Sequence, residues 1–384
     1  MADYHRLVYE RQAGWLLSIA CQRFRVVGRK KLLYIMGIDW QWIYQRPQVI
    51  GRHLETEYDV MVIFPRSVFQ CCMSDKANHP QKYGILWTLP FQEKNAVIGC
   101  LARTAVTHLF RHIESYDGIV IGYPLYYRYI PASYNGKVIY DCMDNHEALY
   151  PYRKGVAQVL SQEKALLQRC DALVASCQRL YDKMQEHVSK DIPKRVIRNG
   201  TDISRTIEPH RGRRVRGRYE IGYFGTLAGW LDYGLLKKSL AMNEGIEYHL
   251  IGPWDGKTFS GCPGLIYEGA IPHNALHQKT KDYACLIMPF VVNDIVEWVD
   301  PVKLYEYVSL GKCIVSVYYD EIRRFEDYIY FYRTQEDYVE LIETLKREQF
   351  PPKYTVKQQK EFLLANSWDS RLREWDSLME AVGL

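Results

Sequence analysis

The feature that most constrains the fold is a regular alternation of short apolar segments with segments of helical spacing. Short β-branched or apolar runs between helices are typical of βαβ units in a parallel sheet. In the first half the expected strands are Lys31–Met36, Asp59–Phe64, Gly118–Gly122, Lys137–Asp141, Ala172–Ser176 and Arg195–Arg198. The expected helices include Gln45–Leu54, Val156–Arg169 and Gln178–His187. The pattern predicts a doubly wound α/β domain over residues 31–204.

The same alternation begins again after residues 205–218, an arginine-rich stretch that we interpret as an interdomain linker. Its strands are expected at Glu220–Phe224, Glu247–Ile251, Leu265–Tyr267, Tyr283–Met288, Ile314–Val317 and Ile329–Tyr332. Its helices are expected at Leu231–Met242, His273–Lys281, Val302–Leu310 and Glu336–Glu348. Because 384 residues suffice for two ordinary domains, the sequence predicts two Rossmann-like domains, 31–204 and 219–355, that face a cleft. Residues 356–384 have helical spacing and form a tail that can pack back on the first domain.

Basic residues concentrate in two segments of the chain. Residues 1–31 contain seven Lys and Arg against two acidic residues, and residues 205–218 contain six Arg against one Glu. Within residues 1–30 an apolar stripe lies beside arginines; it consists of Trp15, Leu16, Leu17, Ile19, Ala20 and Phe24. Such a segment can lie at an anionic membrane surface, while packing on the first domain is an equal alternative. We therefore expect a cytoplasmic protein, peripheral on the inner face of the cell membrane.

Cysteine spacing and apolar run length exclude other classes. The ten cysteines include no C-x-x-C pair, so we interpret them as reduced thiols of a cytosolic protein. The apolar stretch Trp15–Cys21 is far shorter than the roughly 20 residues of a spanning helix, so we expect neither a transmembrane helix nor a signal peptide. The motifs of hydrolases, zinc proteases, P-loop proteins and dinucleotide-binding proteins are absent from the sequence, as are RNA-binding signatures, so no nucleic-acid partner is expected.

One second-domain motif, Gly222–Trp230, follows an expected strand, at the sheet edge where α/β proteins bind ligands. Gly225 allows the backbone to approach a ligand, and Thr226 stands where a helix N-terminus can receive a pyrophosphate. By itself this turn fits a strand-to-helix connection without a ligand equally well.

A second motif, Pro301–Lys312, begins an expected helix. Pro301 suits the first turn, and Lys303 and Glu306 are three residues apart and share one face. An ammonium can neutralise a diphosphate and a carboxylate can hold ribose hydroxyls. A solvated ion pair is the structural alternative.

Three first-domain segments place polar groups at strand ends: Gly37–Pro47, Ile139–His146 and Val196–Asp202. The candidate side chains are Asp39, Trp40, Arg46, Asp141, Asp144 and His146. Exposed Trp can stack on a sugar, although Trp buried between domains is equally compatible. Clustered Asp and His can bind a metal, but no second cluster has ligand spacing, so we favour polar-substrate binding and expect no metal. Asn-Gly in the third segment is a turn signal in any protein.

Taken together and in this order, these segments resemble the GT-B glycosyltransferases of family four, most closely the bacterial teichuronic-acid and capsular-polysaccharide branch. The resemblance is carried by W-I-Y-Q-R-P, Y-D-C-M-D, R-N-G-T-D, Y-F-G-T-L-A-G-W-L-D-Y and P-V-K-L-Y-E-Y-V-S-L-G-K. It implies a retaining hexosyl transfer from a nucleotide-sugar to a glycan or polyprenyl-linked glycan acceptor, without cofactor or metal.

The resemblance also implies residue roles. The donor contacts it implies are Gly225, Thr226, Arg198, Asn199, Ile271, His273, Lys303, Leu304 and Glu306. The acceptor contacts are Asp39, Trp40, Arg46 and Asp141, and the catalytic residues are Asp144, His146 and Glu306. Two positions depart from the family. Trp298 stands where a Glu usually contacts the donor sugar, and Gly229 and Trp230 stand where a basic residue usually binds diphosphate.

Two other functions are compatible with the sequence. A sugar-nucleotide epimerase would use the same donor cleft without a glycan acceptor. A non-catalytic module that binds membranes or nucleic acids through the two basic segments is the third reading.

Overall fold

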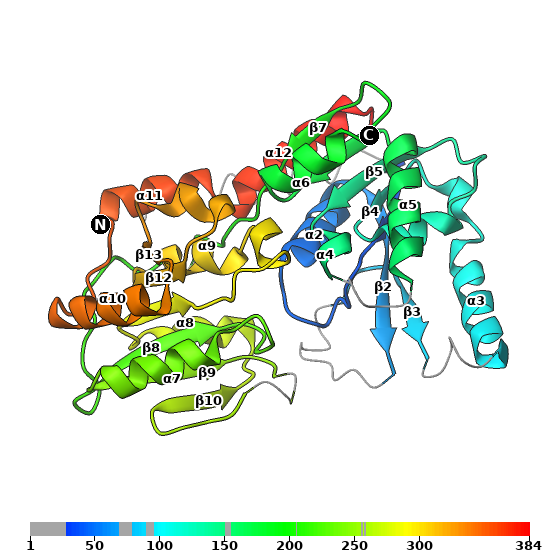
Figure 1. The fold of residues 1–384 in the computed structure, drawn as a ribbon. Coiled ribbons are helices and arrows are strands. Elements are labelled where there is room, and N and C mark those ends of the chain that lie inside the picture. Colours follow the sequence, from blue (N-terminus) through cyan, green and yellow to red (C-terminus); the bar gives the residue numbers. More distant parts are fainter. Residues whose placement is uncertain are drawn as a thin grey trace.

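Two lobes, each built on a parallel sheet with helices on both faces, make up the protein (Figure 1). The computed structural model describes residues 28–68, 79–89, 96–149, 155–204, 206–254, 256 and 259–384. The expected amphipathic segment lies almost entirely outside the described residues, as does Arg205. Both sheets contain only parallel pairs, which confirms the predicted α/β class.

The first lobe contains a seven-stranded sheet in the order β3-β2-β1-β4-β5-β6-β7. Its strands are β1 (Lys31–Ile35), β2 (Asp59–Ser67), β3 (Tyr83–Thr88), β4 (Gly118–Ile121), β5 (Lys137–Cys142), β6 (Ala172–Ala175) and β7 (Lys194–Val196). Its helices are α2 (Arg46–Glu57), α3 (Ala96–Phe110), α4 (His146–Leu149), α5 (Val156–Arg169) and α6 (Gln178–Gln185). The sequence analysis missed β3 and α3, because β3 is an edge strand with only two buried residues, one of which is Gly84.

The second lobe contains a six-stranded sheet in the order β10-β9-β8-β11-β12-β13. Its strands are β8 (Tyr219–Phe224), β9 (Ile246–Ile251), β10 (Leu265–Gly269), β11 (Cys285–Met288), β12 (Cys313–Val317) and β13 (Tyr330–Tyr332). Its helices are α7 (Tyr233–Met242), α8 (His273–Thr280), α9 (Val302–Ser309) and α10 (Gln335–Arg347), with short 3-10 turns η4 (Val296–Trp298) and η5 (Asp320–Phe325). All six expected strands are present within two residues of their predicted bounds.

The strand order reverses at the same place in both sheets. In the first sheet β1 lies between β2 and β4. The chain first adds β2 and β3 on one side of β1, and then adds β4 to β7 on the other side. In the second sheet β8 lies in the same way between β9 and β11. Ligands of open α/β sheets bind outside the carboxyl ends of the strands at this reversal. The loops after β1, β4, β8 and β11 are therefore the places to examine for a site.

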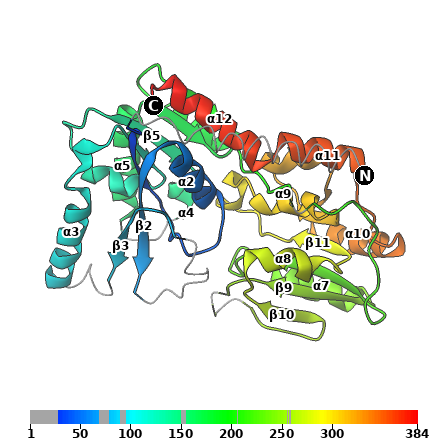
Figure 2. The same cartoon turned by 180° about the vertical axis from the view of Figure 1, so that it is seen from behind.

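The C-terminal tail connects the lobes. α11 (Val356–Ala365) packs against α9 of the second lobe, and α12 (Trp368–Ala381) packs against α2 of the first (Figures 1 and 2). Trp375, Leu378 and Met379 of α12 are buried in the first-lobe core. This burial removes a large apolar area from water, so the tail is part of the first lobe's core.

The chain passes between the lobes twice, and the two passages are hydrogen-bonded to each other. The Thr201 amide donates to the Asn366 carbonyl and the Trp368 amide donates to the Thr201 carbonyl, both at 3.1 Å. Residues 206–218 then follow the second lobe, where the Ile207 amide donates to the Ser309 carbonyl at 2.8 Å.

Candidate functional site

The loops after β8 and β9 meet backbone to backbone at the carboxyl edge of the second sheet. Gly225 and Gly252 have φ values of 142° and 138°, which favour glycine. A Cβ atom on Gly252 would clash with the Gly225 carbonyl oxygen. The Gly225 amide donates to the Ile251 carbonyl at 2.9 Å. These glycines allow a ligand or a neighbouring side chain to approach the main chain closely.

Lys303 occupies the space beside Gly225. A Cβ atom on Gly225 would overlap Lys303 Cε and lie 2.9 Å from Nζ. The same Nζ lies 5.9 Å from the ring centroids of both Tyr223 and Phe290, within cation–π range. Burial lowers the pKa of the Lys303 ammonium, and the nearby Glu306 carboxylate partly opposes that shift. The lysine is thus a half-buried cation at the sheet reversal point.

The helix that presents its amino end to this region is α9, not α7. The sequence analysis placed Thr226 at a helix start, but α7 begins at Tyr233 and is capped by the Asp232 carboxylate, which accepts from the Leu235 amide at 2.8 Å. The amino end of α7 is therefore already occupied by the Asp232 carboxylate. α9 begins after Pro301, has no acidic residue in its first turn, and among the described residues no side chain caps it. Lys303 and the α9 dipole would therefore act together on an anion placed at this edge of the sheet.

Four other predicted donor residues have different environments. Glu306 is half-buried one turn after Lys303, and Ile271 is partly buried against the second-lobe core. Leu304 is fully buried in that core, so its role is packing. His273 is the first residue of α8, and its side chain lies outside the description. Lys303, Glu306 and Gly225 are therefore the residues that the fold brings together.

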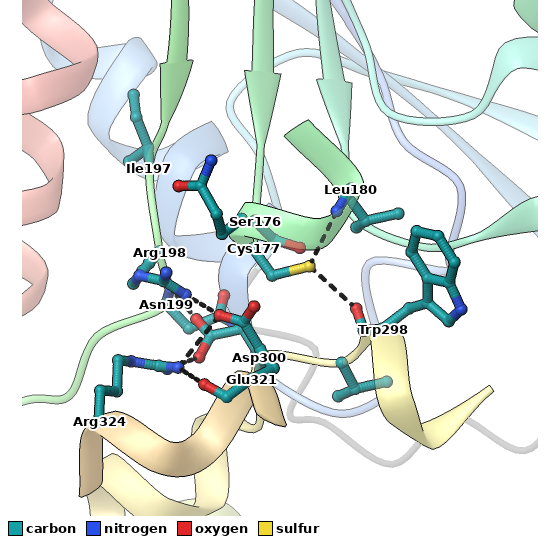
Figure 3. A network of polar contacts seen from close by, with 12 residues as sticks. Ser176, Cys177, Leu180, Ile197, Arg198, Asn199, Trp298, Asp300, Glu321 and Arg324 are labelled. Atoms are coloured by element: carbon teal, nitrogen blue, oxygen red, sulfur yellow. Dashed lines mark hydrogen bonds and ion pairs between the residues drawn. The ribbon is translucent and has the colours of Figure 1, made fainter. Parts of the chain in front are cut away.

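Arg198 and Asn199 join the two lobes (Figure 3). Arg198 pairs with Glu321 of η5. The Asn199 amide donates to Asp300 Oδ2, and Asn199 Nδ2 donates to the Asp300 carbonyl, both at 2.6 Å. Both residues thus make interdomain contacts, while Asn199 Oδ1 is buried without a hydrogen-bond partner among the described residues. The sequence analysis did not identify Asp300 as a residue of the junction. In the sequence it is marked only by its place directly before Pro301, where the expected helix begins.

The first-lobe residues expected to bind acceptor are buried. Arg46 donates to Asp141 at 2.8 Å, and their side chains are 4% and 0% exposed. Asp39 accepts two bonds from Arg66 at 2.7 and 2.8 Å. Trp40 is 3% exposed. Buried side chains like these shape the loops to which they belong, and their contact with an acceptor stays a prediction.

Asp144 and His146 follow the carboxyl end of β5, and the pKa values of both side chains are shifted. Burial, with a contribution from the Asp141 charge, raises the pKa of Asp144 to about 6. Burial, with a contribution from Lys183, lowers the pKa of His146 to about 4. The His146 ring meets Tyr123 edge-on at 5.3 Å, and among the described residues neither ring nitrogen has a hydrogen-bond partner. Perturbed, unpartnered groups of this kind are candidates for substrate contact.

His146 should make stability depend on pH. Its folded pKa of about 4 lies below the ordinary value of 6.5, so the folded protein binds fewer protons. Stability from this group is complete above pH 6.5 and falls by about 3 kcal/mol as the pH drops to 4. Chemical denaturation across this range should show wild-type stability falling by about 3 kcal/mol more than that of His146→Phe, because the opposite pH dependence of Asp144 is common to both proteins. Parallel curves for the two proteins would contradict the assignment.

Trp298, at the position of the missing family Glu, contacts the other lobe. Its ring lies 4.3 Å from the Arg179 guanidinium carbon and 5.3 Å from Lys183 Nζ, both on α6. Its carbonyl accepts from Cys177 Sγ at 3.2 Å. The described residues contain no group of three or more His, Cys, Asp or Glu side chains that could hold a metal ion. No helix in the described part of the chain is long and apolar enough to cross a membrane.

Comparisons with known proteins extend the fold description. No protein-family model matches the chain, and no curated protein sequence matches it. Among solved structures it is similar to the lipopolysaccharide outer core galactosyltransferase WaaB, with 16% identity, a TM-score of 0.62, and 91% of this chain and 99% of that chain covered. It is also similar to Anabaena HepE in complex with UDP and glucose, with 12% identity, a TM-score of 0.65, and coverage of 91% and 99%.

A third similar structure is the sucrose-phosphate synthase of Thermosynechococcus elongatus, with 13% identity, a TM-score of 0.65, and coverage of 92% and 98%. At such identities the likeness shows the fold alone. The two Rossmann-like lobes, with their strand orders and the tail that returns to the first lobe, therefore have the fold of the GT-B glycosyltransferases.

Proposed function

We propose that the protein is a glycosyltransferase that moves a hexose from a nucleotide-sugar donor to an acceptor. The observation that carries the proposal is the Lys303 ammonium beside Gly225 at the amino end of α9, on the reversal point of the second sheet. A cation, a helix dipole and an exposed backbone in one place are what a diphosphate requires. The UDP complexes of the HepE structures support this choice of ligand.

The reaction breaks the bond between the anomeric carbon and a diphosphate oxygen, and the bonding electrons leave with the diphosphate. A new bond forms from the anomeric carbon to an acceptor hydroxyl oxygen, and the proton of that hydroxyl passes to the leaving diphosphate. Lys303 and the α9 amino end would stabilise this developing charge, and Glu306 would accept hydrogen bonds from ribose hydroxyls. Asp144 and His146 would contact the acceptor or the transferred sugar from the first lobe. We further propose retention of configuration, no metal cofactor, and a glycan or polyprenyl-linked acceptor in bacterial surface-polysaccharide synthesis.

A thermal-shift panel of UDP, GDP, ADP and their sugar derivatives tests the donor site. A ligand present at about 100 times its dissociation constant should add about 2.7 kcal/mol of stability. A shift for one nucleoside diphosphate series, followed by acceptor-dependent loss of the sugar-nucleotide, supports the proposal. No shift with any nucleotide contradicts it, and acceptor-independent conversion of the sugar-nucleotide identifies an epimerase.

Asp144→Asn should bind the nucleotide normally and transfer sugar about tenfold to a hundredfold more slowly, because it removes a charged contact from the first lobe only. The measurements are nucleotide affinity by calorimetry and initial transfer rate. An equal loss of both would place Asp144 on the donor wall.

We also propose that residues 1–30 hold the protein at the cytoplasmic membrane surface. Residues 206–218 lead into the amino end of β8, away from the cleft, and Arg213 and Arg218 pair with Asp282 and Glu247. The N-terminal segment therefore carries this part of the proposal.

Sedimentation with vesicles tests this contact. The full chain should pellet with anionic vesicles at low salt, remain in solution with neutral vesicles, and lose binding when residues 1–28 are removed, since each basic residue near the surface contributes about 1 kcal/mol. If the full chain stays in the supernatant with anionic vesicles, the segment has a structural role.

A further inference from the structure

The buried Asp300 carboxylate accepts hydrogen bonds from three residues at the lobe junction. It accepts from the Asn199 amide at 2.6 Å, from the Tyr305 hydroxyl at 2.9 and 3.1 Å, and from Arg324. The residue is 4% exposed. Buried carboxylates with this many donors have one well-defined position, because every alternative leaves a charge or a donor unsatisfied.

The bonds of Asp300 reach both lobes. Asn199 belongs to the chain leaving the first lobe, and its carbonyl accepts from Arg371 of α12 at 3.2 Å. Tyr305 belongs to α9, and Arg324 belongs to η5 of the second lobe. Figure 3 shows Asp300 between Asn199 on one side and Arg324 on the other. The Asp300 carboxylate thus accepts hydrogen bonds from both the chain that leaves the first lobe and the second lobe.

Asp300 also directly precedes the donor-site helix. Pro301 follows it, with φ restricted by the ring, and Lys303 lies on the first turn of α9 three residues after Asp300. A shift of Asp300 would therefore move the α9 amino end and Lys303 relative to Gly225. The Tyr305 bond holds the same turn from inside the helix.

We propose that Asp300 is a positioning residue for the donor site, which fixes the first turn of α9 against the first lobe so that Lys303 stays beside Gly225. The proposal rests on the proposed function of Lys303. It predicts that a change at Asp300 affects diphosphate binding without any contact between Asp300 and the ligand.

Glu321 provides a matched control. It accepts from Arg198 across the junction and from Arg324 within the second lobe, as Asp300 accepts from Asn199 and Arg324. The Glu321 carboxylate pairs with Arg198 and Arg324, and neither of these residues belongs to α9. If the network only joins the lobes, Asp300→Asn and Glu321→Gln should behave alike.

The test combines two readouts on the full chain. The first is the affinity for UDP, GDP or ADP, whichever binds the wild type, with the donor KM and kcat. The second is hydrogen exchange of the amides at 302–304 without ligand. Asp300→Asn should weaken nucleoside-diphosphate binding by about tenfold to a hundredfold, raise the donor KM more than it lowers kcat, and speed the exchange. Glu321→Gln should change neither affinity nor exchange at these amides by more than about twofold.

Tyr305→Phe removes the hydroxyl, which donates to Asp300 and accepts from Arg324, and keeps the buried ring, so it serves if Asp300→Asn does not fold. It should shift both readouts in the same direction by about threefold. Equal effects of the Asp300 and Glu321 variants, or no effect of Asp300→Asn and Tyr305→Phe, overturn the proposal. If the wild type binds none of the three nucleotides, the proposed function fails. The positioning role of Asp300 is then decided by comparing hydrogen exchange at amides 302–304 in Asp300→Asn and Glu321→Gln.

Discussion

Lys303→Met is expected to reduce sugar transfer by about tenfold to a thousandfold, because it removes one charge-assisted contact, about 2–4 kcal/mol, from the leaving diphosphate. Methionine retains the apolar stem that packs near Tyr223 and Phe290. Initial rates with the donor identified by thermal shift measure the loss. Glu306→Gln should also reduce transfer, because it weakens the proposed hydrogen bonds to the ribose hydroxyls of the donor.

Lys238→Met is the matched control for Lys303→Met. Lys238 lies on α7 and pairs with Glu336 at the protein surface. Removing this exposed pair should leave transfer unchanged, since surface ion pairs contribute about 0–1 kcal/mol and this one is remote from Gly225. Near-normal turnover in both Lys303→Met and Glu306→Gln would show that the diphosphate binds elsewhere.

Arg46→Met is expected to destabilise the first lobe by about 3–5 kcal/mol, because it leaves the Asp141 carboxylate buried without its partner. Arg46 also donates to the Ile197 carbonyl at 2.6 Å and lies 6.0 Å from the Trp375 ring. The substitution thus releases contacts among α2, β5, the residue after β7 and α12 at once. Urea denaturation measures the loss of stability.

Arg52→Met is the control on the same helix. Arg52 is one-third exposed, pairs with Glu55 at 3.2 Å and lies over Trp40. Its removal should cost no more than about 1 kcal/mol. The double substitution Arg46→Met with Asp141→Asn should recover part of the loss, because no charge then remains buried. If Arg46→Met stayed within about 1 kcal/mol of the wild type, the ion pair would have no structural importance.

Most of the fold could be predicted from local patterns. The central strands of both sheets are buried on two faces and are therefore continuous apolar runs. Such runs can be recognised in a single sequence. β3 was missed because it lies at a sheet edge, where Tyr83 and Trp87 are exposed. Its helix α3 was missed with it. Edge elements need only one buried face, and their pattern is correspondingly weak.

The candidate site was predicted less completely than the fold. Lys303 and Glu306 were found because helical periodicity places them on one face whatever surrounds the helix. Arg198, Asn199, Arg46 and Asp141 were correctly seen as polar groups at strand ends, yet the structure gives them partners inside the protein. A polar residue after a strand reaches a ligand only if no other part of the chain satisfies it first.

By itself, the sequence determined that this protein has two parallel α/β lobes, because strand and helix periodicity depend on neighbours a few positions away. Only the tertiary structure decided which polar side chains face the cleft. Arg46 and Asp141 are 95 positions apart, and Asn199 and Asp300 are 101 positions apart. Burial makes an unpaired charge costly, so partners that distant in sequence decide whether a residue is free to bind a ligand or holds the lobes together.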